Sequence, residues 1–294
     1  MIGVVVPAND EEALIGRCLD ALRVAAAHPA LAGEHVEIVV VLDACRDATQ
    51  RVADERAVAT LAIDARNVGI ARAAGASALI AGGARWLAFT DADSAVAPDW
   101  LARQLETAAD AVCGVVCIDD WADFSPQARA SYEAAYVDAE QHRHIHGASL
   151  GVSSAAYLRV GGFAPLRSSE DVELVHRLDG QGATIRWTNA VRVNTSARRF
   201  GRAPNGLAAH LHGMERQIAS PVDKSDVAPP VRRLYADREP SARLCRVAQG
   251  TPGLEMLPCA LAPLHCSARQ ETCVARVPCA RRLNSSELND GPLA

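Results

Sequence analysis

The stretch Trp86-Leu87-Ala88-Phe89-Thr90-Asp91-Ala92-Asp93 is apolar in its first half and ends in two carboxylates. Its apolar residues predict a buried strand, and the i, i+2 spacing of Asp91 and Asp93 places both side chains on one side of an extended chain. Open α/β sheets bind ligands at the carboxyl edge of their strands, where paired carboxylates suit Mg²⁺ or Mn²⁺ held against a diphosphate. Taken alone, the two aspartates also fit a turn with a side-chain cap.

The composition is that of an ordinary globular protein, with 294 residues, 49% hydrophobic content and a net charge of -5. This charge gives no reason to expect nucleic acid or an anionic membrane surface as a partner. The apolar run at Ile2–Val6 is too short for a secretory signal, and no run approaches the ~18–20 residues of a membrane span. We therefore expect a cytoplasmic protein without a transmembrane segment, whose cysteines are reduced.

Strand and helix patterns alternate regularly through the first part of the chain. The predicted strands are Ile2–Val6, Val36–Leu42, Leu61–Ile63, Trp86–Thr90 and Val112–Ile118. Helical patterns at 13–22, 49–59, 70–81 and 100–109 separate them. Repeated units with buried strands predict an α/β fold: a doubly wound, mostly parallel, Rossmann-like sheet with helices on both faces.

The pattern changes after residue 118, where we expect a long polar helix from Ser125 to His142. A helix with an acidic first turn begins at Ser169, and strands are predicted near Thr184–Thr188 and Arg192–Thr195. Periodicity fades after residue 219, so residues 220–294 are expected to be a poorly ordered extension. Its cysteines lack the spacing of common zinc sites.

Polar segments follow each of the first four predicted strands. They are Pro7–Glu12, Asp43–Thr49, Arg66–Arg72 and Asp91–Asp93. Because the carboxyl ends of parallel strands share one edge of a sheet, these segments are expected to meet there. Each alone is ordinary loop chemistry, but four in succession indicate a common site.

These segments resemble those of the family 2 glycosyltransferases, which use nucleotide sugars and have the GT-A fold. In that family the first strand ends in a Pro-Ala-x-Asn-Glu-Glu-like segment, and here Asp10 stands where Asn is usual. The second strand ends in Asp-Gly-Ser-x-Asp-x-Thr, matched by Asp43, Asp47 and Thr49, with Ala44-Cys45 in place of Gly-Ser. The resemblance extends over about residues 1–215.

The resemblance implies a role for each matching position. The residues that would line the donor's uridine are Pro7, Ala8, Glu11 and Asp43. Those that would border its nucleotide are Arg66, Asn67 and Arg72, and Asp91 would face its ribose. Asp93 would ligate the Mn²⁺ or Mg²⁺ ion, with Asp91 facing the ribose or a metal-bound water.

Farther along, residues 147–152 and 161–163 look like the family's acceptor-side segment, where Gly147 and Ser149 would contact the acceptor. Glu170-Asp171 looks like its Glu-Asp pair, with Asp171 as the general base and Glu170 beside it. Burial, or Glu170 nearby, would have to raise the pKa of this carboxylate to make it a useful base.

On this basis residues 1–118 would form the nucleotide-sugar-binding half, and residues 119–219 the acceptor-binding and catalytic half, of one GT-A domain. The implied reaction is metal-dependent transfer of a hexose from a nucleoside-diphosphate sugar, a UDP-sugar by preference, to an acceptor hydroxyl. A single displacement assisted by one base would invert the anomeric centre.

The basic residues Arg198 and Arg199 fit either a phosphate clamp over the donor or a solvated basic loop. His210 and His212 follow them; one of the two, with His212 selected, is a candidate to complete the metal shell, and the alternative is a surface or packing histidine. The i, i+2 spacing of His142, His144 and His146 suits a strand-borne metal site or a helix-to-strand junction of mixed exposure.

Two other functions are considered. A catalytically silent module would bind the nucleotide sugar without turnover. A nucleotidyltransferase would normally have a glycine-rich phosphate loop and a lysine after the first strand, but Lys224 is the only lysine. No Gly-x-Gly-x-x-Gly follows the first strand, which disfavours a dinucleotide oxidoreductase. The sugar, the acceptor and the oligomeric state are left open by the sequence.

Overall fold

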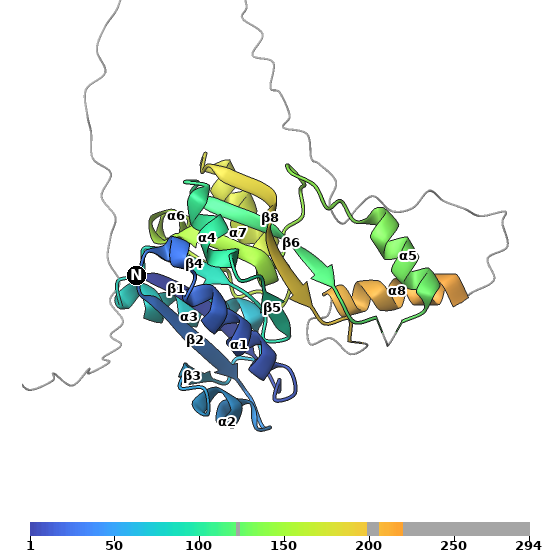
Figure 1. Cartoon of the computed structure of the whole chain (residues 1–294), viewed down its shortest axis with the longest axis horizontal. Helices are drawn as coiled ribbons and strands as arrows, with labels where there is room; N and C mark the ends of the chain where they lie inside the picture. The colour runs from blue at the N-terminus through green and yellow to red at the C-terminus, as the bar shows by residue number, and fades with distance from the viewer. Residues whose placement is uncertain (122–123, 199–205, 220–294) are drawn as a thin grey trace, which may run out of the picture. The chain divides into compact units, whose positions relative to one another are not determined.

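In the computed structural model, which describes residues 1–121, 124–198 and 206–219, eight strands form one sheet in the order β3-β2-β1-β4-β7-β6-β8-β5 (Figure 1). The strands are β1 (Ile2–Ala8), β2 (Val36–Asp43), β3 (Ala59–Ile63), β4 (Trp86–Phe89), β5 (Ser94–Val96), β6 (Ala111–Ile118), β7 (Leu150–Ser153) and β8 (Ile185–Thr195). All run parallel except β7, between β4 and β6, and β5, at the edge beside β8. The predicted mostly parallel α/β sheet is confirmed.

Helices cover both faces of this sheet, because side chains of the central strands alternate between two cores. The helices are α1 (Ile15–Ala26), α2 (Thr49–Asp54), α3 (Val68–Ala81), α4 (Trp100–Glu106), α5 (Pro126–Ala135), α6 (Ser154–Arg159), α7 (Glu170–Gly180) and α8 (Leu207–Ala219), with 3₁₀ turns η1 (Pro29–Leu31) and η2 (Gly147–Ser149). Along β1, Val4 and Val6 pack in the core with α1 and α4, whereas Val5 packs in the core with α3, α6 and α7.

The carboxyl ends of β1 to β4 lie at one edge, and the turns that follow them need unusual backbone. Asp10, Ala44 and Arg66, in the turns after β1, β2 and β3, have positive φ between 49° and 56°, and Ser169, just before α7, has a φ of 60°. A side chain in this left-handed region is strained, and glycine avoids the cost. The φ of 56° at Ala44 explains why the family pattern has glycine there. Such strain is typical of functional loops.

The second half differs from the predicted elements. The expected helix from Ser125 to His142 is wrong, since α5 ends at Ala135 and Tyr136 is extended. The Tyr136 hydroxyl accepts a hydrogen bond from Val116 N of β6 (2.9 Å), so tertiary contacts end the helix. The two predicted strands near Thr184–Thr188 and Arg192–Thr195 are one strand, β8. Helix α8 packs beside α5 (Figure 1), and it was not predicted.

The tail predicted at 220–294 lies outside the described residues. The division of the earlier part at residue 118, where β6 ends, stays a prediction. Among the helices that the structure describes, none has the length and apolar character to cross a membrane. The cytoplasmic location and the absence of a nucleic-acid partner stay predictions.

Candidate functional site

A cleft of about 1160 Å³ opens at the carboxyl edge of β1 to β4 and extends toward β6, α5 and α8. This volume lies just above the ~300–1,000 Å³ that is typical of small-molecule pockets. Its lining brings together most of the predicted site residues, namely Pro7, Ala8, Glu11, Asp43, Arg66, Asn67, Arg72, Asp91, Asp93, Gly147, Glu170, Asp171 and Arg198.

Asp43, at the end of β2, organises the loop that enters α3. Its carboxylate accepts hydrogen bonds from the backbone N–H groups of Ala65 (2.8 Å), Arg66 (2.7 Å) and Asn67 (2.7 Å). Asn67 then caps α3 by accepting from Ile70 N (3.1 Å). The carboxylate therefore shapes the part of the cleft between β2 and α3.

Arg72 of α3 joins the two halves of the site from a buried position. Its guanidinium donates to Asp91 Oδ1 (2.5 Å) and to Glu170 Oε1, and it lies 5.9 Å from the centre of the Phe163 ring. A Cβ on Gly147 would come within 2.4 Å of this guanidinium, so the position needs glycine. Glu170 therefore serves to hold Arg72, which positions the loop after β4 against α7.

Replacing Arg72 by methionine is expected to destabilise the fold by ~3–5 kcal/mol, because the Glu170 carboxylate would remain buried without its partner. The melting temperature should fall by roughly 10 °C, measurable by differential scanning fluorimetry. Arg129→Met is the matched control, since Arg129 forms an exposed pair with Glu133 worth at most ~1 kcal/mol. Equal melting temperatures for the two variants would refute this role of Arg72.

Asp171, in the first turn of α7, faces the same cleft. Its Oδ2 accepts from Gly147 N (2.6 Å) and its Oδ1 from Val172 N (2.8 Å). Burial raises the pKa of the Asp171 carboxyl above its usual value, while Arg72 opposes the rise and the Asp91 charge adds to it. The sequence suggested two causes for a raised pKa of Asp171, burial and the neighbouring Glu170. Burial is the main cause, whereas the Glu170 carboxylate is paired with Arg72.

Asp93 lies in a buried group of negative charges with one cation. Arg198 donates to both carboxylate oxygens of Glu11 (2.7 Å each) and lies 3.0 Å from Asp93 Oδ2. Burial raises the pKa of Asp93 to about 6, with the Asp91 and Glu11 charges adding to the rise and Arg198 opposing it. Carboxylates under such mutual repulsion fit a divalent cation, whose charge would relieve it.

Arg198→Gln is expected to tighten Mn²⁺ binding in the absence of nucleotide by about tenfold, because the guanidinium that competes for Asp93 and Glu11 is removed. Electron paramagnetic resonance of free Mn²⁺ measures this affinity directly. Arg103→Gln, which alters an exposed arginine outside the cleft, is the control. Weaker or unchanged Mn²⁺ binding would show that Arg198 does not compete with the metal.

A second acidic group comprises Asp10, Cys45 and Asp47, whose ligand atoms lie within 4.8 Å of one another. Its carboxylates already accept backbone hydrogen bonds, since Asp10 Oδ1 accepts from Arg46 N (2.6 Å) and Asp47 Oδ1 from Thr49 N (2.9 Å). We therefore interpret this group as a scaffold of the loops after β1 and β2.

Two predicted positions that the structure describes, Ser149 and His212, do not line the cleft. Ser149 is fully buried, and its hydroxyl accepts from Trp100 Nε1 (3.3 Å), so its assignment as an acceptor contact finds no support. His212 packs its ring against Phe124, with ring centres 5.8 Å apart, and its assignment as a metal ligand likewise finds none. Arg199 lies outside the described residues.

Sequence reasoning missed part of the lining. Tyr132, Tyr136, His144, His146 and His210 border the cleft beyond Asp171. The spacing of Tyr132 and Tyr136, and that of the histidines, is evident in the sequence. The sequence pattern, however, predicted both tyrosines on one continuous helix, whereas Tyr136 lies beyond the end of α5. The imidazoles of His142, His144 and His146 stack on one another, with ring centres 5.4 and 5.7 Å apart. This stacking favours a helix-to-strand junction over a metal site for the three histidines.

The fold is that of the GT-A glycosyltransferases. Residues 3–148 match the family described as Glycosyl transferase family 2, and the chain belongs to that family. The predicted family is thus confirmed. A search of the curated proteins gave no match.

Solved structures show the same fold at low sequence identity. S. aureus TarS in complex with UDP-GlcNAc is 16% identical, with a TM-score of 0.52 over 70% of this chain and 61% of that one. The mannosyltransferase PcManGT from Pyrobaculum calidifontis, in complex with GDP-Man and Mn²⁺, is 20% identical, with a TM-score of 0.53 over 78% and 66%. The chain thus spans about three fifths of the length of the TarS structure.

Proposed function

We propose that the protein transfers a hexose from a nucleoside-diphosphate sugar, a UDP-sugar by preference, to an acceptor hydroxyl, with a divalent metal and with inversion. One observation carries the proposal: Asp93 and Asp171, both with raised pKa values, line one cleft. Arg72 links the loop that carries Asp93 to the helix that carries Asp171. Such a pairing of acidic groups suits metal binding at one point and base catalysis at another.

Asp93, with Asp91 and Glu11 nearby, would hold the Mn²⁺ or Mg²⁺ ion. When bound, the ion would neutralise the charge that develops on the leaving diphosphate. The presence of Mn²⁺ with GDP-Man in the PcManGT structure is consistent with such a site. When the metal takes the place of Arg198 beside Asp93 and Glu11, the guanidinium would be released. Because the arginine side chain is long and permanently charged, it would then bind the diphosphate.

Asp171 would remove the proton of the acceptor hydroxyl as the hydroxyl oxygen attacks the anomeric carbon. Its raised pKa makes the carboxylate a stronger base than an exposed aspartate. The Gly147 N–H holds one carboxylate oxygen in place. Attack opposite the leaving diphosphate in a single step would invert the configuration.

Isothermal titration with UDP and with GDP, each with and without Mn²⁺, tests the donor site. A panel of nucleotide sugars in thermal-shift and donor-hydrolysis assays then identifies the sugar, since a ligand at 100 times its Kd stabilises the fold by ~2.7 kcal/mol. Metal-dependent binding with donor turnover is expected. Absence of nucleotide binding would overturn the proposal, and binding without turnover would favour the silent module.

A further inference from the structure

Beyond Asp171 the cleft is bordered by a set of aromatic and imidazole rings, here called the ring wall: Tyr132, Tyr136, His144, His146 and His210. These residues come from α5, from the segment between α5 and η2, and from α8. The backbone N–H of Gly147, the residue after His146, donates to the Asp171 carboxylate. The ring wall therefore lies next to Asp171, where a second ligand would meet this carboxylate.

Four of the five rings are nearly parallel, whereas His210 meets Tyr132 with ring centres 6.4 Å apart and planes at 63°. Tyr136 stacks on His144 with centres 4.3 Å apart and planes at 7°, and on Tyr132 at 5.4 Å and 20°. His146 lies 5.9 Å from Tyr136 at 21°. Offset stacks of this kind fix the orientation of each ring, so the wall presents ring faces and edges in a set geometry.

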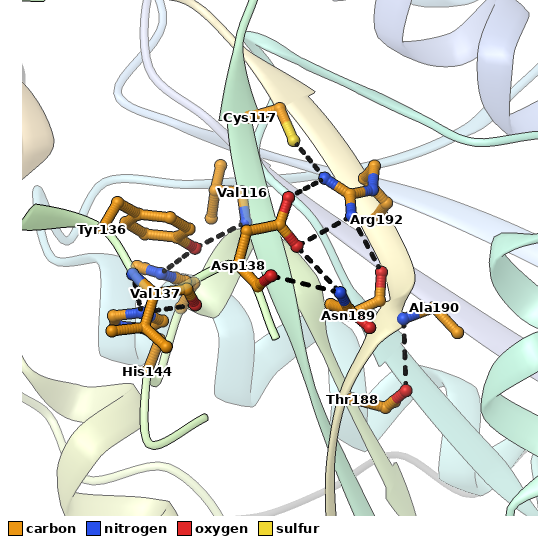
Figure 2. A network of polar contacts seen from close by, with 11 residues as sticks. Val116, Cys117, Tyr136, Val137, Asp138, His144, Thr188, Asn189, Ala190 and Arg192 are labelled. Carbon is orange, nitrogen blue, oxygen red and sulfur yellow. Dashed lines mark hydrogen bonds and ion pairs between the residues drawn. The ribbon is translucent and has the colours of Figure 1, made fainter. Parts of the chain in front are cut away.

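Strand β8 anchors the segment that carries these rings (Figure 2). Arg192 donates to both carboxylate oxygens of Asp138 (2.7 and 2.9 Å), and Asn189 Nδ2 donates to the same side chain (3.0 Å). The Tyr136 hydroxyl accepts from Val116 N of β6 and lies 3.0 Å from His146 Nε2. The wall is therefore preorganised rather than a loose loop.

The ring wall is also uncharged at neutral pH. Burial lowers the pKa of His144, and burial together with the neighbouring imidazoles lowers the pKa of His146 to about 3. The other described side chains that line this end are apolar, Val137 and Ile145 among them. The carboxylates and guanidinium groups of the described lining lie on the donor side, with Glu170 and Asp171 at the boundary.

We infer that the acceptor is an uncharged sugar ring that packs one face on the ring wall and directs a hydroxyl to Asp171. The inference rests on the proposed transferase function. The electron-rich faces of aromatic rings attract the C–H groups on one face of a pyranose. Among the residues that the structure describes, no cation lines this end of the cleft, so a carboxylate or phosphate on the acceptor would be desolvated there without one of them to pair with it.

The first test compares matched acceptors with the full chain in the presence of UDP and Mn²⁺. Methyl glucoside and methyl galactoside are paired with the corresponding methyl uronides, and saturation-transfer NMR titration reports their binding. We expect at least one neutral glycoside to bind about tenfold more tightly than its uronide. Equal or tighter binding of both uronides, or no binding of either neutral glycoside, would overturn the inference.

The second test places a cation in the wall. Val137 lines the cleft and has 53% of its surface exposed, and Val24 on α1, outside the cleft, has 55% exposed. Val137→Arg should shift the neutral-to-uronide affinity ratio toward the uronide by about tenfold, whereas Val24→Arg should leave the ratio as in the natural chain. The same ratio in both variants would place the acceptor elsewhere.

The two proposals fail in different ways. If neither UDP nor GDP binds with Mn²⁺, the transferase function falls and this inference falls with it. If a nucleotide sugar is bound and hydrolysed while the uronides bind at least as tightly as the neutral glycosides, the function stands and the inference alone is wrong.

Discussion

Asp171→Asn is expected to lower sugar transfer by ~10²–10⁴-fold, the usual contribution of a general base, while the affinity for UDP with Mn²⁺ stays within about threefold. The amide keeps the size of the carboxyl group, and its single oxygen can accept one of the two hydrogen bonds from Gly147 N and Val172 N, but it does not take up a proton. Steady-state transfer assays and nucleotide titration measure the two effects separately.

Asp179→Asn, an exposed change on the same helix, is the matched control. The natural chain should lose transfer as the pH falls through the raised pKa of Asp171, above the ordinary value of about 3.9. A normal transfer rate in Asp171→Asn would show that another group is the base.

The stability of the same variant provides an independent check. A carboxyl whose folded-state pKa is raised stabilises the fold fully below its unfolded pKa and loses that contribution as the pH rises through the folded pKa. At pH 7.5 the buried charge of Asp171 therefore opposes folding. The melting temperature of the natural chain, measured relative to that of Asp171→Asn, is therefore expected to rise as the pH is lowered from 7.5.

Asp93→Asn is expected to weaken Mn²⁺-dependent nucleotide binding by ~100-fold or more, equivalent to ~2.7 kcal/mol, because an amide is a poor replacement for an ionised ligand of a hard cation. Titration of UDP with Mn²⁺ and with EDTA gives the metal-dependent part. In Asp93→Asn the UDP affinity measured with Mn²⁺ should be nearly the same as the affinity measured with EDTA.

Asp99→Asn, at the start of α4 and outside the cleft, controls for the loss of one negative charge. If Asp93→Asn keeps the full difference in UDP affinity between Mn²⁺ and EDTA, the metal must bind elsewhere. The group of Asp10, Cys45 and Asp47 would then be the next site to examine.

The part of the cleft at the carboxyl ends of β1 to β4 was predictable because many of its residues end or directly follow a strand with a strong apolar pattern. The loops after β1 to β4 therefore place Asp43, Asp91 and Asp93 at one edge by topology alone. The other side depends on contacts between distant segments. Tyr136 leaves the helical pattern because β6 supplies a partner for its hydroxyl.

Two further features escaped prediction for related reasons. The Arg72 interaction with Glu170 joins residues 98 positions apart, which no local pattern reveals. Helix α8 carries apolar residues at Leu207, Leu211, Met214 and Ile218, a helical spacing that was present in the sequence and was overlooked beside the basic segment.

The two hydrogen bonds of Arg72 have a consequence for the order of substrate addition. Because one guanidinium holds both Asp91 and Glu170, a change at either carboxylate is expected to alter the position of Arg72 and, with it, the hydrogen bond to the other carboxylate. A donor that draws on Asp91 would thereby adjust the position of Asp171 before any acceptor arrives. Such coupling favours an ordered kinetic sequence in which the nucleotide sugar binds first, and it implies that substitutions at Asp91 and Glu170 have non-additive energetic effects.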